Sequence, residues 1–486
     1  MDVYELDAFR CRELLAGGEI SVRELTQVFL DRVEERDADV RAFLAVNGEE
    51  ALAQAADVDS RPLSERTSWE GIPVGLKDVL CVKGRETTAG SRMLEGYHPP
   101  YDATAVSKLR EAGLISLGRL NMDEFAMGSS TENSAFFPTH NPWDLMRVPG
   151  GSSGGSAASV SAGEVPWSLG TDTGGSIRQP ASLCGVVGLK PTYGAVSRHG
   201  LIAFASSLDQ VGPITRNVRD AAALLGMIQG KDPLDSTSVG FNEPIREPTT
   251  VDLSGRRFGI IKEFIGAACE PGVRRVFNLA VSAIEALGGE CEEVSLPSTE
   301  RGLSAYYIIA PAEASSNLAR FDGVRYGMRT EGALDLMDMY KRTRSEGFGA
   351  EVKRRIMIGT HVLSAGYYDA YYGQAQRTRT LIIRDFAKAF TDYDVLISPT
   401  SPTIAFKLGE RVEDPLAMYQ ADLCTNPVSL AGLPGLSLPA GFSEGMPVGV
   451  QLVAPHFADQ ELLEVGFALE RELDVSTKPD GEEVAP

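Results

Sequence analysis

The sequence GGSSGGS at residues 150–156 is followed by TDTGGSIRQP at residues 171–180, so two Gly-Ser clusters lie 24 residues apart, counted from Ser152 to Ser176. The first cluster alone fits a flexible linker, because glycine and serine give flexible chains. However, SAASVSA follows it directly with helix or core composition, and a linker needs no second cluster behind the strand-like WSLG at residues 167–170. The pair of clusters therefore favours an ordered site over a linker.

Glycine-rich loops that open helices also bind phosphate groups. Neither GxxxxGK[ST] nor GxGxxG occurs here in a strand–loop–helix setting, so a nucleotide site in this chain is not supported. A serine on a turn, with glycine N–H groups converging where a carbonyl oxygen becomes an oxyanion, points instead to nucleophilic catalysis.

Such a serine needs a base. GGSSG at residues 150–154 also fits the GxSxG turn of α/β-hydrolases, which use a histidine, but each of the five histidines fits a surface or packing role: His98, His140, His199, His361 and His456. A lysine can replace the histidine only if burial and its neighbours lower its pKa. Lys77 lies in the apolar, strand-like run GIPVGLKDVL at residues 71–80, although a snorkelling or salt-bridged lysine fits the same run.

Strand and helix patterns alternate along the chain, which predicts an α/β fold. Ser21 and Glu24 form a capping box before a helical run, and Asp102 is expected to cap a second helix that leads to a strand at residues 114–117. Further patterns predict a strand in RRFGIIKEF at 256–264, a helix closed by Gly288, and a strand after Tyr393.

The same patterns divide the chain into three parts. We expect an N-terminal helical segment at 1–65, a catalytic domain at 66–475 and a disordered tail at 476–486. Within the catalytic domain, the core spans about 66–230 and 395–475, and a mostly helical insertion spans about 300–393.

The net charge is strongly negative. Asp and Glu number 67 against 46 Lys and Arg, which gives −21, and only 11 of the basic residues are lysine. A phosphate backbone repels such a chain, so strong nucleic-acid binding by this chain on its own is not expected. The composition also suggests a cell interior with molar salt, where a Debye length of about 3 Å screens the self-repulsion.

The cysteines and the hydropathy of the sequence indicate the cellular compartment of the protein. The six cysteines lie far apart without a CxxC pair, which fits neither a disulfide framework nor a zinc finger, and we expect them to be buried. No run approaches the roughly 20 apolar residues of a membrane-spanning helix, and the beginning, MDVYELDAF, is acidic, unlike a signal peptide. These features predict a cytoplasmic protein.

Taken together, the motifs resemble the amidase signature family. The resemblance rests on four segments in a specific order: GLKD at 75–78, GGSSGG at 150–155, TDTGGSIRQP at 171–180 and CGVVGLKPT at 184–192. It implies the fold of that family, an α/β structure with a central mixed β-sheet covered by helices on both faces.

The resemblance also assigns roles. It implies Ser176 as the nucleophile that forms an acyl ester, Ser152 as a bridging serine held by a cis peptide bond, and Lys77 as the base behind it. It places the oxyanion hole at backbone N–H groups of one turn, formed by Thr173, Gly174, Gly175 and Ser176.

Within the family, the closer similarity is to glutamine-hydrolysing A subunits of tRNA-dependent amidotransferases, through segments at 121–133, 310–317 and 364–369. Glutamine needs an anion for its α-ammonium group and a cation for its α-carboxylate, ideally a bidentate arginine. The resemblance gives these roles to Asp422 and Arg355 and places Tyr306 in the pocket, while Arg354 and Tyr307 compete with the latter two.

A protein of this kind would release ammonia from glutamine for transfer to Glu-tRNA(Gln) or Asp-tRNA(Asn). The resemblance implies no cofactor or metal in this chain, with ATP and Mg²⁺ at a partner subunit. It implies B and C subunits as partners, with the misacylated tRNA contacted mainly through the B subunit. The alternative is a stand-alone amidase of the same family acting on small amides, and a histidine-dependent esterase or a non-catalytic scaffold are further alternatives.

Three positions depart from the pattern of the family. Val79 stands where Asn is common, Phe137 stands where Gly is common, and Arg119 replaces a customary Lys. None belongs to the proposed triad, although Phe137 is expected to reshape the wall of the pocket.

Overall fold

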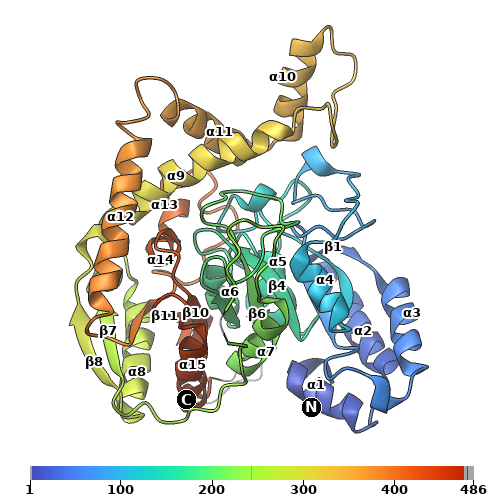
Figure 1. Ribbon diagram of the computed structural model, residues 1–486, viewed down its shortest axis with the longest axis vertical. Helices are drawn as coiled ribbons and strands as arrows, with labels where there is room; N and C mark the ends of the chain where they lie inside the picture. Colours follow the sequence, from blue (N-terminus) through green and yellow to red (C-terminus); the bar gives the residue numbers. More distant parts are fainter. Residues whose placement is uncertain (1–2, 242, 476–478, 480–486) are drawn as a thin grey trace.

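One β-sheet of eleven strands runs through the described part of the chain, in the order β1-β3-β2-β4-β6-β5-β10-β11-β9-β7-β8 (Figure 1). The structure is a computed structural model that describes residues 3–241, 243–475 and 479. The strands are β1 (Phe43–Val46), β2 (Pro73–Lys77), β3 (Ile115–Leu120), β4 (Trp167–Asp172), β5 (Val187–Lys190), β6 (Gln210–Thr215), β7 (Arg257–Ile261), β8 (Glu290–Val294), β9 (Val395–Pro399), β10 (Gly435–Ser443) and β11 (Met446–Val453).

The sheet is mixed. Strand β2 pairs in parallel with β3 and β4, and β7 pairs in parallel with β8 and β9. The strands between these two groups, and β1 at the edge, pair antiparallel. The predicted α/β class with a mixed central sheet is confirmed.

Helices cover both faces of the sheet. A Cβ atom at Gly435 of β10 would lie 3.1 Å from the side chain of Arg178 in α6, whereas the next side chain, Leu436, packs against Gly466 of α15. Successive strand residues point to opposite faces, so α6 and α15 lie on opposite sides. The α-helices are α1 (Ala8–Ala16), α2 (Val22–Val40), α3 (Gly48–Asp59), α4 (Thr104–Glu111), α5 (Gly154–Ser161), α6 (Arg178–Cys184), α7 (Val218–Ile228), α8 (Pro271–Ala286), α9 (Gly302–Asn317), α10 (Leu336–Gly347), α11 (Ala350–Val362), α12 (Tyr372–Ala389), α13 (Pro415–Gln420), α14 (Asn426–Leu430) and α15 (Asp459–Leu473).

The N-terminal segment combines helices with one strand. The predicted capping box of α2 is present, since Ser21 Oγ accepts from the Glu24 N–H at 3.1 Å and the Glu24 carboxylate accepts from the Ser21 N–H at 2.8 Å. The helical prediction for residues 1–65 did not include β1, which pairs with β3 and joins this segment to the sheet.

The predicted cap at Asp102 is wrong. Helix α4 begins at Thr104 with Ala103 at its N-cap, and this cap makes no side-chain hydrogen bond. The Asp102 carboxylate instead accepts from the Lys83 N–H at 2.7 Å and binds Arg110. A local pattern cannot show that a carboxylate is already held by a segment about twenty residues away.

The stretch between β8 and β9 is helical, as the pattern at 300–393 predicts, and it contains α9 to α12. Helix α10 lies farthest from the sheet (Figure 1). The division into an N-terminal segment, core and insertion stays a prediction, and the tail predicted at 476–486 lies, apart from Pro479, outside the described residues.

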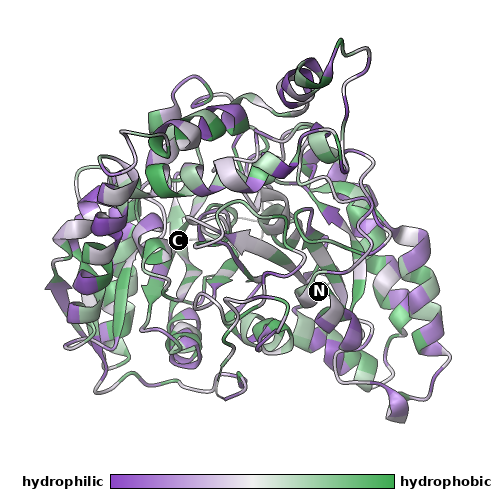
Figure 2. Ribbon diagram, turned by 45° about the horizontal axis from the view of Figure 1, so that its top comes forward, coloured by the Kyte–Doolittle hydropathy of each residue, from purple (hydrophilic) through white to green (hydrophobic). Residues whose placement is uncertain are grey.

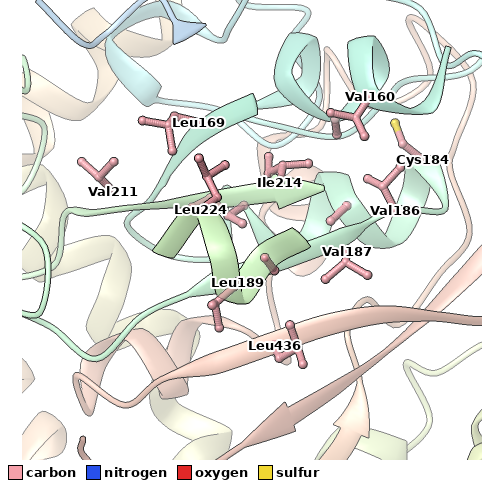
Figure 3. Packing of buried hydrophobic residues seen from close by; sticks show 14 of the residues in the cluster. Val160, Leu169, Cys184, Val186, Val187, Leu189, Val211, Ile214, Leu224 and Leu436 are labelled. Atoms are coloured by element: carbon pink, nitrogen blue, oxygen red, sulfur yellow. The ribbon is translucent and has the colours of Figure 1, made fainter. Parts of the chain in front are cut away.

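The core lies between the sheet and its helices. Apolar residues gather on the strands and on the inner sides of the helices (Figure 2). Neighbouring strands contribute Leu169, Ile214, Leu189 and Leu436, and Leu224 of α7 packs with this cluster (Figure 3). Each such side chain stabilises the fold by about 1.5–3 kcal/mol relative to an exposed one. All six cysteines are free; five are buried, and the sixth, Cys291 in β8, is half-buried.

One edge of the sheet is acidic. Strand β8 forms this edge, and its sequence ECEEV exposes three glutamates: Glu290, Glu292 and Glu293. Among the described residues, no helix combines the length and the hydropathy needed to span a membrane.

Candidate active site

The candidate site lies where β2 and β4 end. These strands are parallel neighbours, with Gly75 opposite Ser168 and Leu76 opposite Leu169. The carboxyl ends of parallel strands meet at the same edge of a sheet, where ligand sites of α/β folds form. Lys77 ends β2, and the glycine-rich turn follows β4, so the topology brings these two motifs together.

Lys77 is buried and surrounded by hydroxyl groups. Its Nζ atom donates hydrogen bonds to Ser152 Oγ at 2.7 Å, Ser153 Oγ at 2.8 Å and Thr171 Oγ1 at 2.9 Å. The side chain has no exposed surface and pairs with no carboxylate among the described residues. The snorkelling and salt-bridged arrangements that the sequence permits are therefore absent here.

Burial lowers the pKa of Lys77 to about 7, because desolvation penalises the ammonium form. The carboxylates of Asp123, Asp172 and Asp209 raise the pKa and only partly offset this effect. Asp123 is bound by backbone N–H groups of Thr131 and Asn133, so it stays close without pairing with the amine. An amine with this pKa is about half neutral near pH 7, and its neutral form can accept a proton.

The first Gly-Ser cluster forms a fixed loop before α5. The peptide bond between Gly151 and Ser152 is cis, as the resemblance implies. Gln179 Oε1 accepts from the Gly151 N–H at 3.0 Å, and Thr131 Oγ1 donates to the Gly150 carbonyl at 2.8 Å. The sequence patterns give no role to these two polar side chains, because only the folded chain shows that they hold this loop.

The second cluster forms the turn between β4 and α6. Gly175 has φ of +147°, and a Cβ atom there would lie 2.2 Å from Thr425 Oγ1, so only glycine fits. Thr425 Oγ1 donates to the Gly174 carbonyl at 2.7 Å. Within the described part of the chain, none of the N–H groups of residues 173–176 donates a hydrogen bond, which leaves them available to an oxyanion.

The two clusters meet through their backbones. The Ser153 N–H donates to the Ser176 carbonyl at 3.1 Å, and Ser176 is 7% exposed. No hydrogen bond joins the hydroxyls of Ser152 and Ser176 among the described residues. Catalytic hydrogen bonds often tighten only when substrate binds, so the relay between these hydroxyls stays a prediction.

A buried ion pair supports the turn. Arg178 donates to both carboxylate oxygens of Asp172 at 2.9 Å, and Asp172 also accepts from the Ile177 N–H at 3.2 Å. Arg178 further binds Gln451 and Ser429. Asp172 and Arg178 both belong to the motif TDTGGSIRQP. Only the structure shows that their ion pair joins the residue before the turn to the first residue of α6.

The structure separates the two competing arginines. Arg355 is buried on α11, where its Nε atom donates to Glu351 Oε1 at 2.8 Å and its guanidinium lies 5.1 Å from the centre of the Tyr307 ring. The side chain of Arg354 is 43% exposed and pairs with the same Glu351 at the surface. Arg355 is therefore the better placed of the two for a buried substrate carboxylate.

The rings of the two tyrosines pack edge to face with centres 5.1 Å apart, but their other neighbours differ. Tyr306 contacts the turn, since a Cβ atom at Gly174 would lie 2.7 Å from the Tyr306 hydroxyl oxygen. Tyr307 stacks on Tyr419 with ring centres 3.8 Å apart. Tyr306 thus borders the turn that carries Ser176, and Tyr307 forms part of the aromatic surroundings of Arg355.

Asp422 is buried next to the turn. Its Oδ2 atom accepts from Ser129 Oγ at 2.6 Å, and its Oδ1 atom has no hydrogen-bond partner among the described residues. Burial raises the pKa of Asp422 to about 7, against the lowering effects of Ser129 and Arg355. A substrate ammonium group at Oδ1 would favour the carboxylate form.

None of the five histidines binds Lys77, Ser152 or Ser176 in the described part of the chain, which argues against a histidine base. The residues described contain no cluster of three or more His, Cys, Asp or Glu side chains that could hold a metal ion.

The three departures from the family pattern lie in different surroundings. Arg119 pairs with the buried Asp78 at 2.9 Å, and Val79 is fully buried. Phe137 lies beneath Arg41, whose guanidinium is 5.4 Å from the ring centre.

The sequence model of the amidase family matches residues 24–463. The chain belongs to the amidase family. The chain is 57% identical over 474 residues to the A subunit of the glutamyl-tRNA(Gln) amidotransferase of Moorella thermoacetica, and the match covers 97% of both chains. It is 54% identical over 481 residues to the protein of that name from Thermoanaerobacter pseudethanolicus, with 99% of both chains covered.

Solved structures agree with this assignment. The crystal structure of the A subunit of the glutamyl-tRNA(Gln) amidotransferase from Thermotoga maritima matches with a TM-score of 0.81 and 45% identity, covering 97% of this chain and 95% of that one. A bacterial aryl acylamidase of the amidase signature enzymes matches with a TM-score of 0.85 and 25% identity, covering 99% of each. The resemblance stated from the motifs is confirmed, and so is the amidase-signature fold.

We expect glutamine hydrolysis by this amidase family member to depend on deprotonation of Lys77. Because the pKa of Lys77 is lowered to about 7, kcat/KM should rise with pH up to about 7 and then level off. On the acid side it should fall by about tenfold to a hundredfold per pH unit, because protonation of Asp422, whose pKa is also raised to about 7, adds to protonation of Lys77. Lys77→Ala should lose at least about 1,000-fold, and Lys77→Ala combined with Ser176→Ala should be hardly worse, because the groups act as a unit. As a control, substitution of the exposed Lys83 by Ala should leave kcat/KM unchanged. If kcat/KM of Lys77→Ala fell at low pH as steeply as that of the unsubstituted protein, the assignment of Lys77 would be wrong.

Substitution of Arg355 should lower glutaminase activity much more than substitution of Arg354. Arg355→Lys keeps the charge but loses the planar fork, and should lower kcat/KM for glutamine mainly by raising KM, by about 30- to 1,000-fold. Arg354→Ala should stay within about 3-fold of the unsubstituted protein, as expected of an exposed ion pair. Steady-state glutaminase assays measure both, and a larger loss in Arg354→Ala would reverse the assignment.

Proposed function

We propose that this chain is the glutamine-hydrolysing component of a tRNA-dependent amidotransferase, which converts Glu-tRNA(Gln), Asp-tRNA(Asn) or both to the amidated forms. The observation that carries the proposal is the 57% identity to the A subunit of a glutamyl-tRNA(Gln) amidotransferase over 97% of both chains. The buried amine of Lys77 among three hydroxyls supports the chemistry that this function requires.

In the proposed mechanism, neutral Lys77 accepts a proton from Ser152, which accepts the proton of Ser176. The Ser176 oxygen attacks the side-chain carbonyl carbon of glutamine, and the N–H groups of residues 173–176 stabilise the oxyanion. The proton returns through Ser152 to the leaving nitrogen, so ammonia departs and a glutamyl ester remains. Water then hydrolyses the ester by the same proton path and releases glutamate.

Two charged side chains would hold the substrate. The unpaired Oδ1 atom of Asp422 suits the α-ammonium group, and the buried Arg355 suits the α-carboxylate. Tyr306 borders the turn between them. The α-ammonium and α-carboxylate groups are bonded to the same carbon, so an anion and a cation near each other select an α-amino acid over a simple amide.

A stand-alone amidase is less well supported. The crystal structure of an amidase matches with a TM-score of 0.81, the same value as the Thermotoga maritima protein, so the fold does not separate the two functions. Sequence identity does, since the amidase is 31% identical and the Thermotoga maritima protein 45%.

The proposal includes partners. Ammonia has to reach a second site that activates the tRNA-bound carboxylate, and we place ATP and Mg²⁺ there, on a B subunit that is joined by a C subunit. A chain with a net charge of −21 is poorly suited to bind tRNA by itself, so the B subunit should make most tRNA contacts. A cytoplasmic location follows from the substrate.

The test is amidation of misacylated tRNA. The full chain, purified with the proteins that accompany it from its own cells, should convert Glu-tRNA(Gln) or Asp-tRNA(Asn) with glutamine as nitrogen donor. Ser176→Ala should abolish conversion with glutamine but retain it with added ammonia, because only the glutaminase step is lost. Efficient hydrolysis of varied small amides by the chain alone, without tRNA amidation, would favour the stand-alone amidase.

We also propose that the acidic composition adapts the protein to high salt. Carboxylate repulsion destabilises a chain with a net charge of −21, and molar salt, with a Debye length of about 3 Å, screens it. The melting temperature should therefore rise by about 5 °C or more between 0.1 and 2 M KCl. A non-ionic osmolyte at equal osmolarity is the control, and a melting temperature that does not rise with KCl would refute the adaptation.

A further inference from the structure

Asn426 is a buried amide with no partner. It begins α14 and has no exposed surface, yet neither its Oδ1 nor its Nδ2 atom makes a hydrogen bond among the described residues. Buried amides are normally paired, because leaving one unpaired costs its lost hydration. An unpaired amide therefore needs an explanation, and a ligand that completes it is one.

The position of Asn426 indicates which ligand. A Cβ atom at Gly174 would lie 2.4 Å from Asn426 Oδ1, so the amide is in contact with the turn that carries Ser176. The preceding residue, Thr425, binds the Gly174 carbonyl, and the Asn426 N–H donates to the Asp422 carbonyl at 3.0 Å. The segment 422–426 is thus fastened to the turn and presents two unpaired groups beside it, Asp422 Oδ1 and the Asn426 amide.

The role of Asn426 follows from pairing each polar group of glutamine with a polar group of the site, a step that rests on the proposed glutaminase function. Glutamine has four polar groups: an ammonium, a carboxylate, a carbonyl oxygen and an amide nitrogen with two N–H donors. Asp422, Arg355 and the N–H groups of the turn suit the first three. The amide nitrogen needs an acceptor, and Asn426 Oδ1, which lies against Gly174 as the Tyr306 hydroxyl does, is unpaired among the described residues.

We propose that Asn426 is a specificity residue whose Oδ1 atom accepts a hydrogen bond from the side-chain N–H₂ group of the substrate. An amide satisfies this oxygen. With Oδ1 toward the substrate, a carboxylate or an ester presents another acceptor to it, so this orientation of the amide disfavours the hydrolysed product and oxygen analogues of the substrate. A site that pairs a polar group selects strongly against analogues that lack it, because its own group is then left unpaired.

The test compares glutamine with the γ-methyl ester of glutamate, which has the same reacting carbonyl but no N–H. With the full chain and its co-purified partners, Asn426→Ala should lower kcat/KM for glutamine about tenfold or more and leave the ester within about threefold. Asn426→Asp keeps an acceptor of the same size and should preserve more of the amide preference than Asn426→Ala. Inhibition by glutamate should strengthen in Asn426→Ala.

A matched control separates specificity from packing. Asn141 is equally buried, but its Nδ2 atom donates to the carbonyls of Val148 and Leu183. Asn141→Ala should lower the melting temperature more than Asn426→Ala does and leave the amide-to-ester ratio unchanged. Equal losses for amide and ester in Asn426→Ala would overturn the specificity role. If the unsubstituted protein hydrolyses neither glutamine nor the ester, both the proposed function and this inference are wrong. An amide-to-ester ratio that stays the same in Asn426→Ala would contradict this inference alone.

Discussion

The ε-amino group of Lys77 is cut off from water at the end of β2, and three hydroxyl groups are its hydrogen-bond partners. Hydroxyls can donate to a neutral amine or accept from a charged one, so they leave the proton free to move. A carboxylate in the same place would hold the ammonium form by its charge. The nearest carboxylates are engaged elsewhere, Asp172 with Arg178 and Asp123 with backbone N–H groups.

This arrangement requires that three distant segments meet in one place. The parallel pairing of β2 and β4 sets the distance between the lysine and the glycine-rich turn. Glycine is needed where the turn passes Thr425, and the Asp172–Arg178 pair fixes the start of α6. The segment after α13 contacts the turn through the hydrogen bond from Thr425 to the Gly174 carbonyl. The fold thus supplies the geometry, while the chemistry depends on a few side chains that exclude water.

Local patterns in the sequence predicted the features that depend on neighbouring residues. The capping box at Ser21, the helical stretch between β8 and β9 and the α/β class agree with the structure, while the mixed character of the sheet was implied by the family resemblance. The comparisons confirm the family resemblance, from which the roles proposed for Lys77 and the serines come; alternation of strands and helices alone does not give such roles. The cap at Asp102 failed because a contact with Lys83 outweighs the local preference.

Contacts between distant residues were beyond the sequence. Thr171 lies 94 positions from Lys77 and begins the motif TDTGGSIRQP, in which nothing marks it as a partner of an amine. The choice between Arg354 and Arg355 depends on which face of α11 is buried, and a run of two arginines does not show it. The unpaired amide of Asn426 is invisible in sequence, because only a complete inventory of hydrogen bonds reveals that a partner is missing.

The acidic edge strand has a consequence for the molecule as a whole. A sheet whose last strand is open can extend by pairing with a strand of another molecule, which leads to aggregation. If two copies of β8 aligned side by side, Glu290, Glu292 and Glu293 would bring like charges together, and such pairs are unfavourable. The three glutamates therefore oppose growth of the sheet between molecules at the β8 edge.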